Sequence, residues 1–174
     1  KLFVALAVVV VLLIGFCTFV AFQTSEFEVI RSTMIEAPAD KLFEQVDTLK
    51  NWENWSPWAK LDPEMQTTYE GPDFGKGASY SWSGNDKVGK GKLTILESDP
   101  PNRVRYELEF IEPYAATSIT EFTFEPEGDA TKVSWSMQGK NDFVGKAMCL
   151  FMDMDKLIGQ DFEKGFANMK ELVK

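Results

Sequence analysis

With 174 residues the chain can bury one substantial hydrophobic core, and nothing in its length demands two globular domains. It carries 27 acidic and 18 basic residues, a formal net charge of −9, which disfavours contact with nucleic-acid phosphates and anionic lipid headgroups. It has no histidine, which excludes His-based catalytic triads and His metal sites and removes the commonest general base. We therefore expect no nucleic-acid partner, no metal and no cofactor.

The chain opens with an apolar run that begins at Leu2 and ends at Phe22, 21 residues without a charge. As a helix this run would extend about 32 Å, which matches a hydrocarbon core of roughly 30 Å. We interpret residues 1–22 as a transmembrane helix that anchors the chain in a membrane. The alternative is a cleaved signal peptide, but the run is longer than a usual signal core and ends without a small-x-small cleavage pattern.

The charges that flank this run predict its orientation. Lys1 precedes the run, and Glu26 and Glu28 follow it. Because cytoplasmic flanks are enriched in basic residues, we expect the N-terminus in the cytoplasm and the globular part outside it. Residues 23–26 form a link too short to act as a flexible tether, so the domain should lie close to the bilayer.

Seven strand-like runs separated by turn residues come next. The first, residues 27–35, precedes a short amphipathic helix that starts near Pro38 and ends near Val46. The other six runs are residues 65–70, 77–83, 88–97, 103–111, 116–125 and 131–138. Successive strands joined by short turns predict an antiparallel meander with one apolar face.

Three tryptophans, Trp52, Trp55 and Trp58, lie between the short helix and the second strand. Two interpretations remain open. In the first, the rings plug the open end of the sheet, since aromatic side chains dominate small cores. In the second, one or two of them line the mouth of a ligand site.

The last segment begins at Asp142 and ends at Lys174, and its pattern predicts a single long helix. Its apolar residues recur at steps of three and four, which is the period of one helical face. They are Val144, Met148, Phe151, Met152, Ile158, Phe162, Phe166, Met169 and Val173. We expect this stripe to cover the inward face of the sheet.

Three polar or small residues interrupt that helix. Asp155 would be a desolvated base if it pointed inward, but we expect it at the edge of the stripe, where it reaches water. Gly159 and Gly165 each cost roughly 1 kcal/mol relative to alanine in a helix. They either let the helix approach the sheet closely or leave space for a ligand, and the pattern does not choose between the two.

The order of these elements carries a resemblance, together with the local sequences WENWSPW at 52–58, DPP at 99–101, FEP at 124–126, VSW at 133–135 and IGQDFEKGFANMK at 158–170. The chain from residue 27 to 174 resembles the SRPBCC superfamily of START, Bet v 1 and polyketide cyclase-like proteins. Within it, the chain is similar to bacterial proteins with one N-terminal membrane span. The resemblance implies an α+β helix-grip fold: a curved antiparallel sheet of about seven strands around a long C-terminal helix, preceded here by the transmembrane helix. It also implies an apolar cavity and a single-pass protein of the bacterial inner membrane. With the orientation that the flanking charges predict, the domain would lie on the periplasmic side.

Two functions from different classes fit these observations. The first is a membrane-anchored module that binds a lipid or another hydrophobic molecule in an apolar cavity. The second is an accessory subunit that docks onto a larger membrane protein complex. A cyclase or hydrolase is disfavoured, because inward polar groups are sparse, and we predict no catalytic residue. The predicted ligand-binding residues are Trp55, Trp58, Tyr80, Trp82, Tyr106, Phe110, Trp135, Met137, Met148 and Met152.

Overall fold

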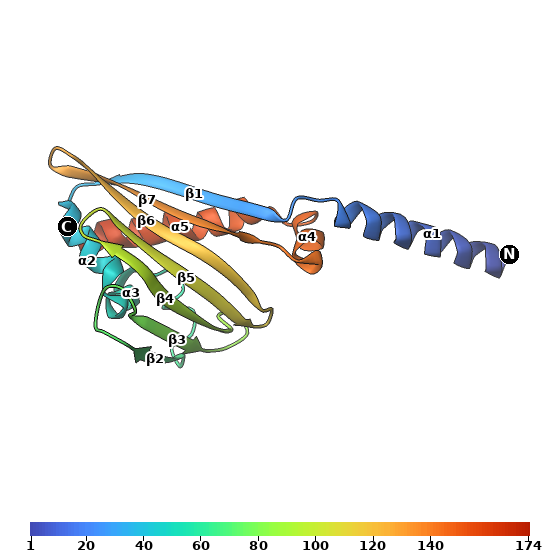
Figure 1. Ribbon diagram of the computed structural model, residues 1–174, viewed down its shortest axis with the longest axis horizontal. Helices are drawn as coiled ribbons and strands as arrows, with labels where there is room; N and C mark the ends of the chain where they lie inside the picture. Colours follow the sequence, from blue (N-terminus) through green and yellow to red (C-terminus); the bar gives the residue numbers. More distant parts are fainter.

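A seven-stranded antiparallel sheet forms the centre of the computed structural model, which describes residues 1–174 (Figure 1). The strands are β1 Glu26–Ile35, β2 Gln66–Glu70, β3 Ser79–Ser83, β4 Lys90–Asp99, β5 Arg103–Glu112, β6 Ala116–Glu127 and β7 Ala130–Lys140. Their order in the sheet is β1-β7-β6-β5-β4-β3-β2, so that the first strand closes beside the last. The predicted meander is confirmed, and each predicted strand bound lies within two residues of the observed one.

The helices are placed around this sheet (Figure 1). Their bounds are α1 Leu2–Ala21, α2 Ala39–Asp47, the 3-10 helix η1 Leu49–Asn51, α3 Trp52–Trp55, α4 Phe143–Cys149 and α5 Met154–Leu172. Helix α5 runs along β1, whereas α2 and α3 gather near the far end of α5, and α1 projects away from the sheet (Figure 1). This arrangement confirms the predicted α+β helix-grip fold.

The two ends of the sheet differ in what surrounds them. The pairing of Glu26 with Lys140 and of Lys90 with Glu112 brings the start of β1, the end of β7 and the β3–β4 and β5–β6 turns to one end. We call it the α1 end, because α1 leads into β1 there (Figure 1). The β6–β7 turn, where Glu127 pairs with Ala130, lies at the opposite end.

The core follows the predicted alternation along the strands. The inward residues of β4 to β7 that are buried include Leu93, Ile95, Val104, Tyr106, Phe122, Phe124, Val133, Trp135 and Met137. They join the buried face of α2 and three residues of α5, namely Phe162, Phe166 and Met169. One apolar face of the sheet is therefore covered by both helices, and its charged neighbours remain on the outer face.

The prediction of a single helix from Asp142 to Lys174 is wrong, because the segment forms two helices separated near residues 150–153. Asp142 caps α4 by accepting a hydrogen bond from the Gly145 N–H at 2.7 Å. Asp153 caps α5 in the same way, accepting from the Lys156 N–H at 3.0 Å. An aspartate side chain that accepts a hydrogen bond from the backbone favours a helix start over a helix interior. The cap at Asp153 therefore starts a new helix, and α5 is separate from α4.

This break also corrects the predicted orientation of Met148 and Met152. Both were expected on the inward stripe, but Met148 is 36% exposed and Met152 is 42% exposed. Between them Phe151 is 79% exposed. Only the part of the stripe within α5 faces the core, because α4 turns away from it and lies beside the end of α1 (Figure 1).

Helix α1 has 20 residues and a mean hydropathy of 3.0, so it is long and apolar enough to cross a membrane or to act as a signal sequence. Most of its side chains are exposed, and Val20 in its last turn is the one that is buried. The Lys146 ammonium of α4 donates a hydrogen bond to the Ala21 carbonyl at 3.2 Å. The end of α1 is thus in contact with the rest of the chain through α4.

Candidate functional site

Trp135 lies at the centre of a packed aromatic cluster between the sheet and α5. Its ring stacks on Phe162 with centroids 3.9 Å apart and on Phe122 at 4.6 Å. Its indole N–H donates to the Thr120 hydroxyl at 2.8 Å, so its polar atom is satisfied. A Cβ added at Gly165 would lie 2.9 Å from the Trp135 ring. Gly165 therefore serves the close approach of α5 to the sheet, and the space above Trp135 is filled.

Trp52, Trp55 and Tyr106 continue this cluster toward α2. The indole N–H groups of Trp52 and Trp55 donate to the carbonyls of Val46 and Gln45, each at 2.9 Å. The Tyr106 hydroxyl also donates to the Val46 carbonyl at 2.9 Å, and burial raises the pKa of Tyr106 well above its ordinary value. Tyr106 is thus a neutral hydrogen-bond donor, and Trp52 and Trp55 are buried core residues, which favours the packing interpretation over a ligand mouth at these two positions.

Four half-buried aromatic side chains form a row across β2, β3 and β5. Ring centroids are 5.9 Å apart for Tyr69 and Tyr80, 5.6 Å for Tyr80 and Trp82, and 6.2 Å for Trp82 and Phe110. We call these four residues the aromatic row. They lie on the inward face, because Tyr80 pairs directly with the buried Leu93.

The local sequence explains how the row is held together. Gly91 of β4 pairs with Trp82 on one side and with Phe110 on the other. A Cβ at Gly91 would lie 2.3 Å from the Trp82 ring, so the absent side chain lets the indole cover the β4 backbone and reach Phe110. The Trp82 N–H donates to the Val88 carbonyl at 3.0 Å. The row therefore continues the apolar inward face as far as the α1 end of the sheet.

Ionisation in the row is suppressed. Burial, together with the nearby Glu53 carboxylate, raises the pKa of Tyr69 to about 12. The Tyr69 hydroxyl donates to Glu53 at 2.8 Å. Burial likewise raises the pKa of Tyr80. At neutral pH the row therefore presents uncharged aromatic surface and no acid or base.

The predicted site residues separate into four places. Tyr80, Trp82 and Phe110 lie in the aromatic row. Trp55, Tyr106, Trp135 and Met137 are buried in the core, and Met148 and Met152 lie exposed in α4 and in the turn after it. Trp58 is half-buried, with its ring 5.8 Å from Trp135 and its N–H donating to the Asp161 carboxylate at 3.3 Å. Of the predicted residues, Tyr80, Trp82, Phe110 and Trp58 are thus half-buried, whereas four others are packed in the core.

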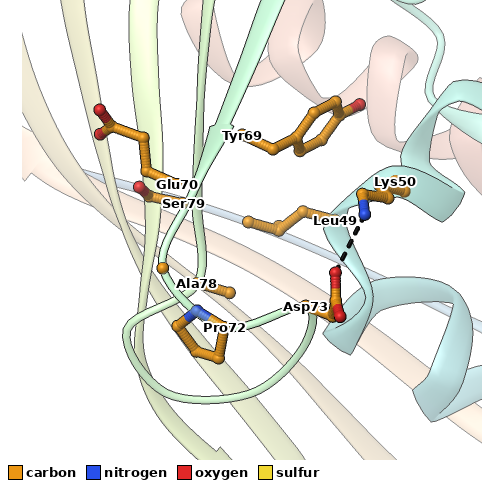
Figure 2. Close-up of a pocket in the computed structure, with 9 residues that line it drawn as sticks. Leu49, Lys50, Tyr69, Glu70, Pro72, Asp73, Ala78 and Ser79 are labelled. Atoms are coloured by element: carbon orange, nitrogen blue, oxygen red, sulfur yellow. Dashed lines mark hydrogen bonds and ion pairs between the residues drawn. The ribbon is translucent and has the colours of Figure 1, made fainter.

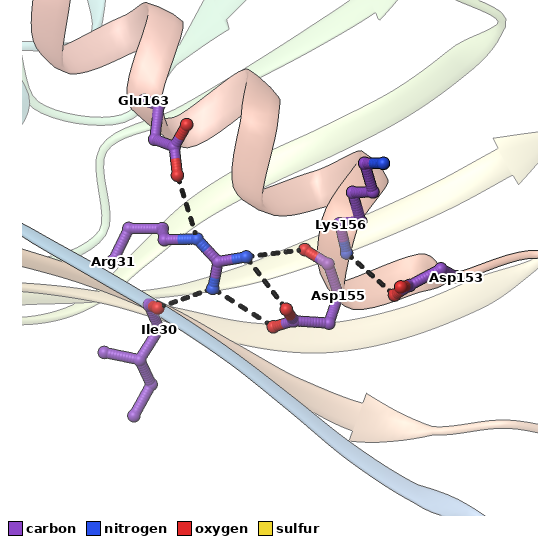
Figure 3. A network of polar contacts seen from close by, with 6 residues as sticks. All are labelled: Ile30, Arg31, Asp153, Asp155, Lys156 and Glu163. Atoms are coloured by element: carbon purple, nitrogen blue, oxygen red, sulfur yellow. Dashed lines mark hydrogen bonds and ion pairs between the residues drawn. The ribbon is translucent and has the colours of Figure 1, made fainter.

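A charged contact that the sequence analysis missed joins β1 to α5 (Figure 3). The Arg31 guanidinium donates to both carboxylate oxygens of Asp155, at 2.8 and 3.1 Å, and to the Asp155 carbonyl at 3.0 Å. The Arg31 Nε–H also donates to a carboxylate oxygen of Glu163 at 3.3 Å. Arg31 lies two residues after Val29 and therefore shares the inward face of β1, and this position was the only sequence signal for it.

This contact determines what Asp155 and Gly159 do. The hydrogen bond from Arg31 lowers the pKa of Asp155, so the carboxylate stays ionised and is a poor general base. A Cβ on Gly159 would lie 2.1 Å from a guanidinium nitrogen of Arg31. Gly159 therefore leaves space for the arginine and not for a ligand.

Replacing Gly159 by alanine is expected to lower the free energy of unfolding by about 1–3 kcal/mol, because the new methyl group displaces the Arg31 guanidinium. In an unobstructed helix the same change would stabilise by up to about 1 kcal/mol. The measurement is urea unfolding of the full chain in detergent micelles, followed by near-ultraviolet circular dichroism. The control is the same substitution in an Arg31→Ala background, where the penalty should disappear. An equal penalty in both backgrounds would contradict this role of Gly159.

Asp47 is a second buried carboxylate that the sequence analysis did not identify. It ends α2, is 5% exposed and accepts a hydrogen bond from the Ser98 hydroxyl at 2.7 Å. Burial raises its pKa, which that hydrogen bond partly offsets. Because Ser98 pairs with Val104 far from Phe110 along β5, Asp47 lies away from the α1 end of the aromatic row.

A small cavity of about 130 Å³ lies between η1 and the loop that joins β2 to β3 (Figure 2). Its lining includes Tyr69, and it also contains the ion pair of Lys50 with Asp73 at 3.0 Å. A space of this size and polarity suits a few water molecules, whereas sites for drug-sized ligands usually enclose about 300 Å³ or more. We assign no ligand to this cavity.

Comparisons with known proteins extend these observations. Residues 26–174 match the sequence profile of a family described as "Polyketide cyclase / dehydrase and lipid transport". A comparison with curated protein sequences gives no significant match. The family match covers the whole sheet and both C-terminal helices.

Several solved structures share the fold at low sequence identity. A protein from Rhizobium leguminosarum is 15% identical, with a TM-score of 0.64 over 87% of this chain and 96% of that chain. Major latex-like protein 151 from Panax ginseng is 15% identical, with a TM-score of 0.61 over 86% of this chain and 99% of that one. Protein CV1439 from Chromobacterium violaceum is 15% identical, with a TM-score of 0.61 over 84% and 96%. At such identities the likeness shows the fold alone.

Proposed function

The chain belongs to the polyketide cyclase/dehydrase and lipid transport family, and from this premise we propose that it is a membrane-anchored module that binds a lipid or another hydrophobic small molecule. The aromatic row is the observation that carries the proposal. Tyr80, Trp82 and Phe110 contact the ligand, and Trp58 borders the same face. Trp55, Tyr106, Trp135 and Met137 belong to the packed core on the same inward side of the sheet.

The chemistry of the row favours binding over catalysis. Its neighbours on the inward face are apolar, since Leu93 and Leu108 pair with each other and Tyr80 pairs with Leu93. Its two phenols stay protonated at neutral pH because burial raises their pKa values. An apolar ligand that covers the remaining exposed surface of these half-buried rings would be stabilised by the burial of that surface from water. Recognition would therefore depend on shape and apolar area.

Helix α1 supports the anchoring part of the proposal. Its 20 residues, which carry no charge, would extend about 30 Å, the thickness of a hydrocarbon core. Lys1 before the helix, with Glu26 and Glu28 after it, favours a domain on the periplasmic side of a bacterial inner membrane. The aromatic row extends to the α1 end of the sheet, so a ligand bound there would lie near the bilayer from which it came.

Photo-crosslinking tests where the ligand binds. Membranes that contain the full chain would be loaded with a long-chain fatty acid carrying a diazirine, irradiated and digested, and the modified peptides identified by mass spectrometry. We expect crosslinks on β3 and β5 in addition to those on α1, which any membrane span would acquire. Crosslinks confined to α1 would contradict a binding site on the sheet.

The accessory subunit remains a second candidate, and one observation favours it. The Trp135 ring stacks on Phe162 at 3.9 Å, so the apolar cavity that the resemblance implied for this chain is filled at this point. A filled interior would leave the surface and the span to perform the function. A stable partner in the membrane would then replace the ligand as the main contact of the chain.

A further inference from the structure

Helix α4 and the turn after it expose an unusual amount of apolar surface. Six large apolar side chains in ten residues are each at least 36% exposed, and Phe151 reaches 79%. They are Phe143, Val144, Met148, Leu150, Phe151 and Met152, and we call them the α4 patch. A short segment with this much exposed apolar surface is typical of a site that contacts another protein or a membrane.

The position of the α4 patch is fixed relative to the end of α1. The Asn141 N–H donates to the Ser25 carbonyl at 2.7 Å, so α4 starts beside the segment that leaves α1. The Lys146 ammonium donates to the Ala21 carbonyl, and Val20 is fully buried at the same junction. Figure 1 shows α4 next to the base of α1. The patch therefore lies at the depth of the last turn of α1.

That depth identifies what covers the patch, if α1 spans the bilayer as proposed above. A span of about 30 Å fills the hydrocarbon core, which places Ala21 at its boundary with the headgroups. Side chains beside Ala21 then lie where apolar groups enter the first few ångströms of the acyl region. In water the same Phe and Leu side chains would remain exposed at a cost in free energy.

The charges near the patch indicate how it would bind. Lys146 is the only basic residue of α4, and its ammonium is engaged with the Ala21 carbonyl. Asp142 and Asp153 carry negative charge at either end of the patch, as helix caps. The surface thus lacks the basic cluster that attracts anionic lipids, so binding would rest on apolar burial and change little with salt.

We propose that residues 143–152 lie in the membrane interface as a second membrane-contacting element beside α1. The proposal rests on the anchoring by α1 proposed above. Two membrane contacts, α1 and the α4 patch, would hold the domain in one orientation. In that orientation the α1 end of the sheet, with Trp82 and Phe110, faces the bilayer.

The chain contains its own reporter for this contact, because Cys149 lies in α4 and is exposed. A Cys17→Ser variant of the full chain would be labelled at Cys149 with an environment-sensitive fluorophore and reconstituted into phosphatidylcholine vesicles. Some vesicles would contain lipids brominated in the acyl chains. We expect the brominated lipids to quench the label strongly, with little change at high salt. The matched control is a label at position 129, in an Asp129→Cys, Cys149→Ser, Cys17→Ser variant, at the opposite end of the sheet.

The outcomes separate the two proposals. A severalfold larger loss of fluorescence at Cys149 than at position 129 supports the interfacial position of the α4 patch. Equal, small losses at both positions in protein that floats with the vesicles would overturn it while leaving the anchoring intact. Protein that does not float with the vesicles would instead contradict the anchoring by α1.

Discussion

Replacing Trp135 by alanine is expected to lower the free energy of unfolding by about 3–5 kcal/mol, a large part of the 5–15 kcal/mol typical of a domain. The reason is that Trp135 fills the space between Phe122 and Phe162 and satisfies its own indole N–H through Thr120. The variant would leave a cavity that the tightly packed neighbours close only in part. Urea unfolding of the full chain in detergent micelles measures the loss.

The control for this prediction is Phe74→Ala, which removes an aromatic side chain that is 65% exposed in the β2–β3 loop. It should change the free energy of unfolding by less than about 0.5 kcal/mol. A Trp135→Ala variant that loses less than about 1 kcal/mol would contradict a packed core at this place. It would indicate that Trp135 lines an open ligand cavity.

Replacing Trp82 by alanine is expected to reduce photo-crosslinking of the fatty-acid probe to β5 about five- to tenfold, and Phe110→Ala should act similarly. Each change removes half-buried aromatic surface worth about 1 kcal/mol or somewhat more to an apolar ligand. The core should tolerate both changes better than the loss of Trp135, because neither ring is fully buried.

Tyr114→Ala is the matched control for the aromatic row. Tyr114 lies at the same end of the sheet, in the β5–β6 turn, but it is 65% exposed and outside the row. Its loss should leave the crosslinking unchanged. If Tyr114→Ala reduced the signal as much as Trp82→Ala, the ligand would lie on the outer turns and not on the inward face.

The strands and the family could be predicted from the sequence because both depend on local patterns. Alternation such as Val104 with Tyr106 defines an inward face whatever that face touches, and turn residues mark where each strand ends. The match of residues 26–174 to the family confirms the resemblance carried by the tryptophan segment and the closing helix. Local sequence patterns were therefore sufficient to predict the strands and the family.

The break between α4 and α5 could not be predicted from periodicity alone. The steps of three and four continue through Met148, Phe151 and Met152, although these side chains are exposed. Asp153 is a residue type that often starts helices, but an isolated aspartate is also common on the solvent-exposed face of a helix, so it did not reveal the break. This apolar segment lies beside α1 and not on the core, and periodicity does not reveal which surface a stripe contacts.

The role of Gly159 required a contact between distant segments. A glycine in a helix signals close approach, and Arg31 stood at an inward position of a strand. That the two meet follows only from how α5 crosses β1, which depends on the whole sheet.

The aromatic row posed a similar problem: Tyr80, Trp82 and Phe110 were predicted, but Tyr69 on the short edge strand was missed.

Native mass spectrometry of the full chain, released gently from its own membrane, tests the central proposal most directly. We predict one apolar ligand per chain, which is lost when the domain is mildly unfolded and which lipid analysis then identifies. A Trp82→Ala, Phe110→Ala variant should retain less of it. An empty domain recovered together with the same larger membrane proteins would contradict the binding module and favour the accessory subunit.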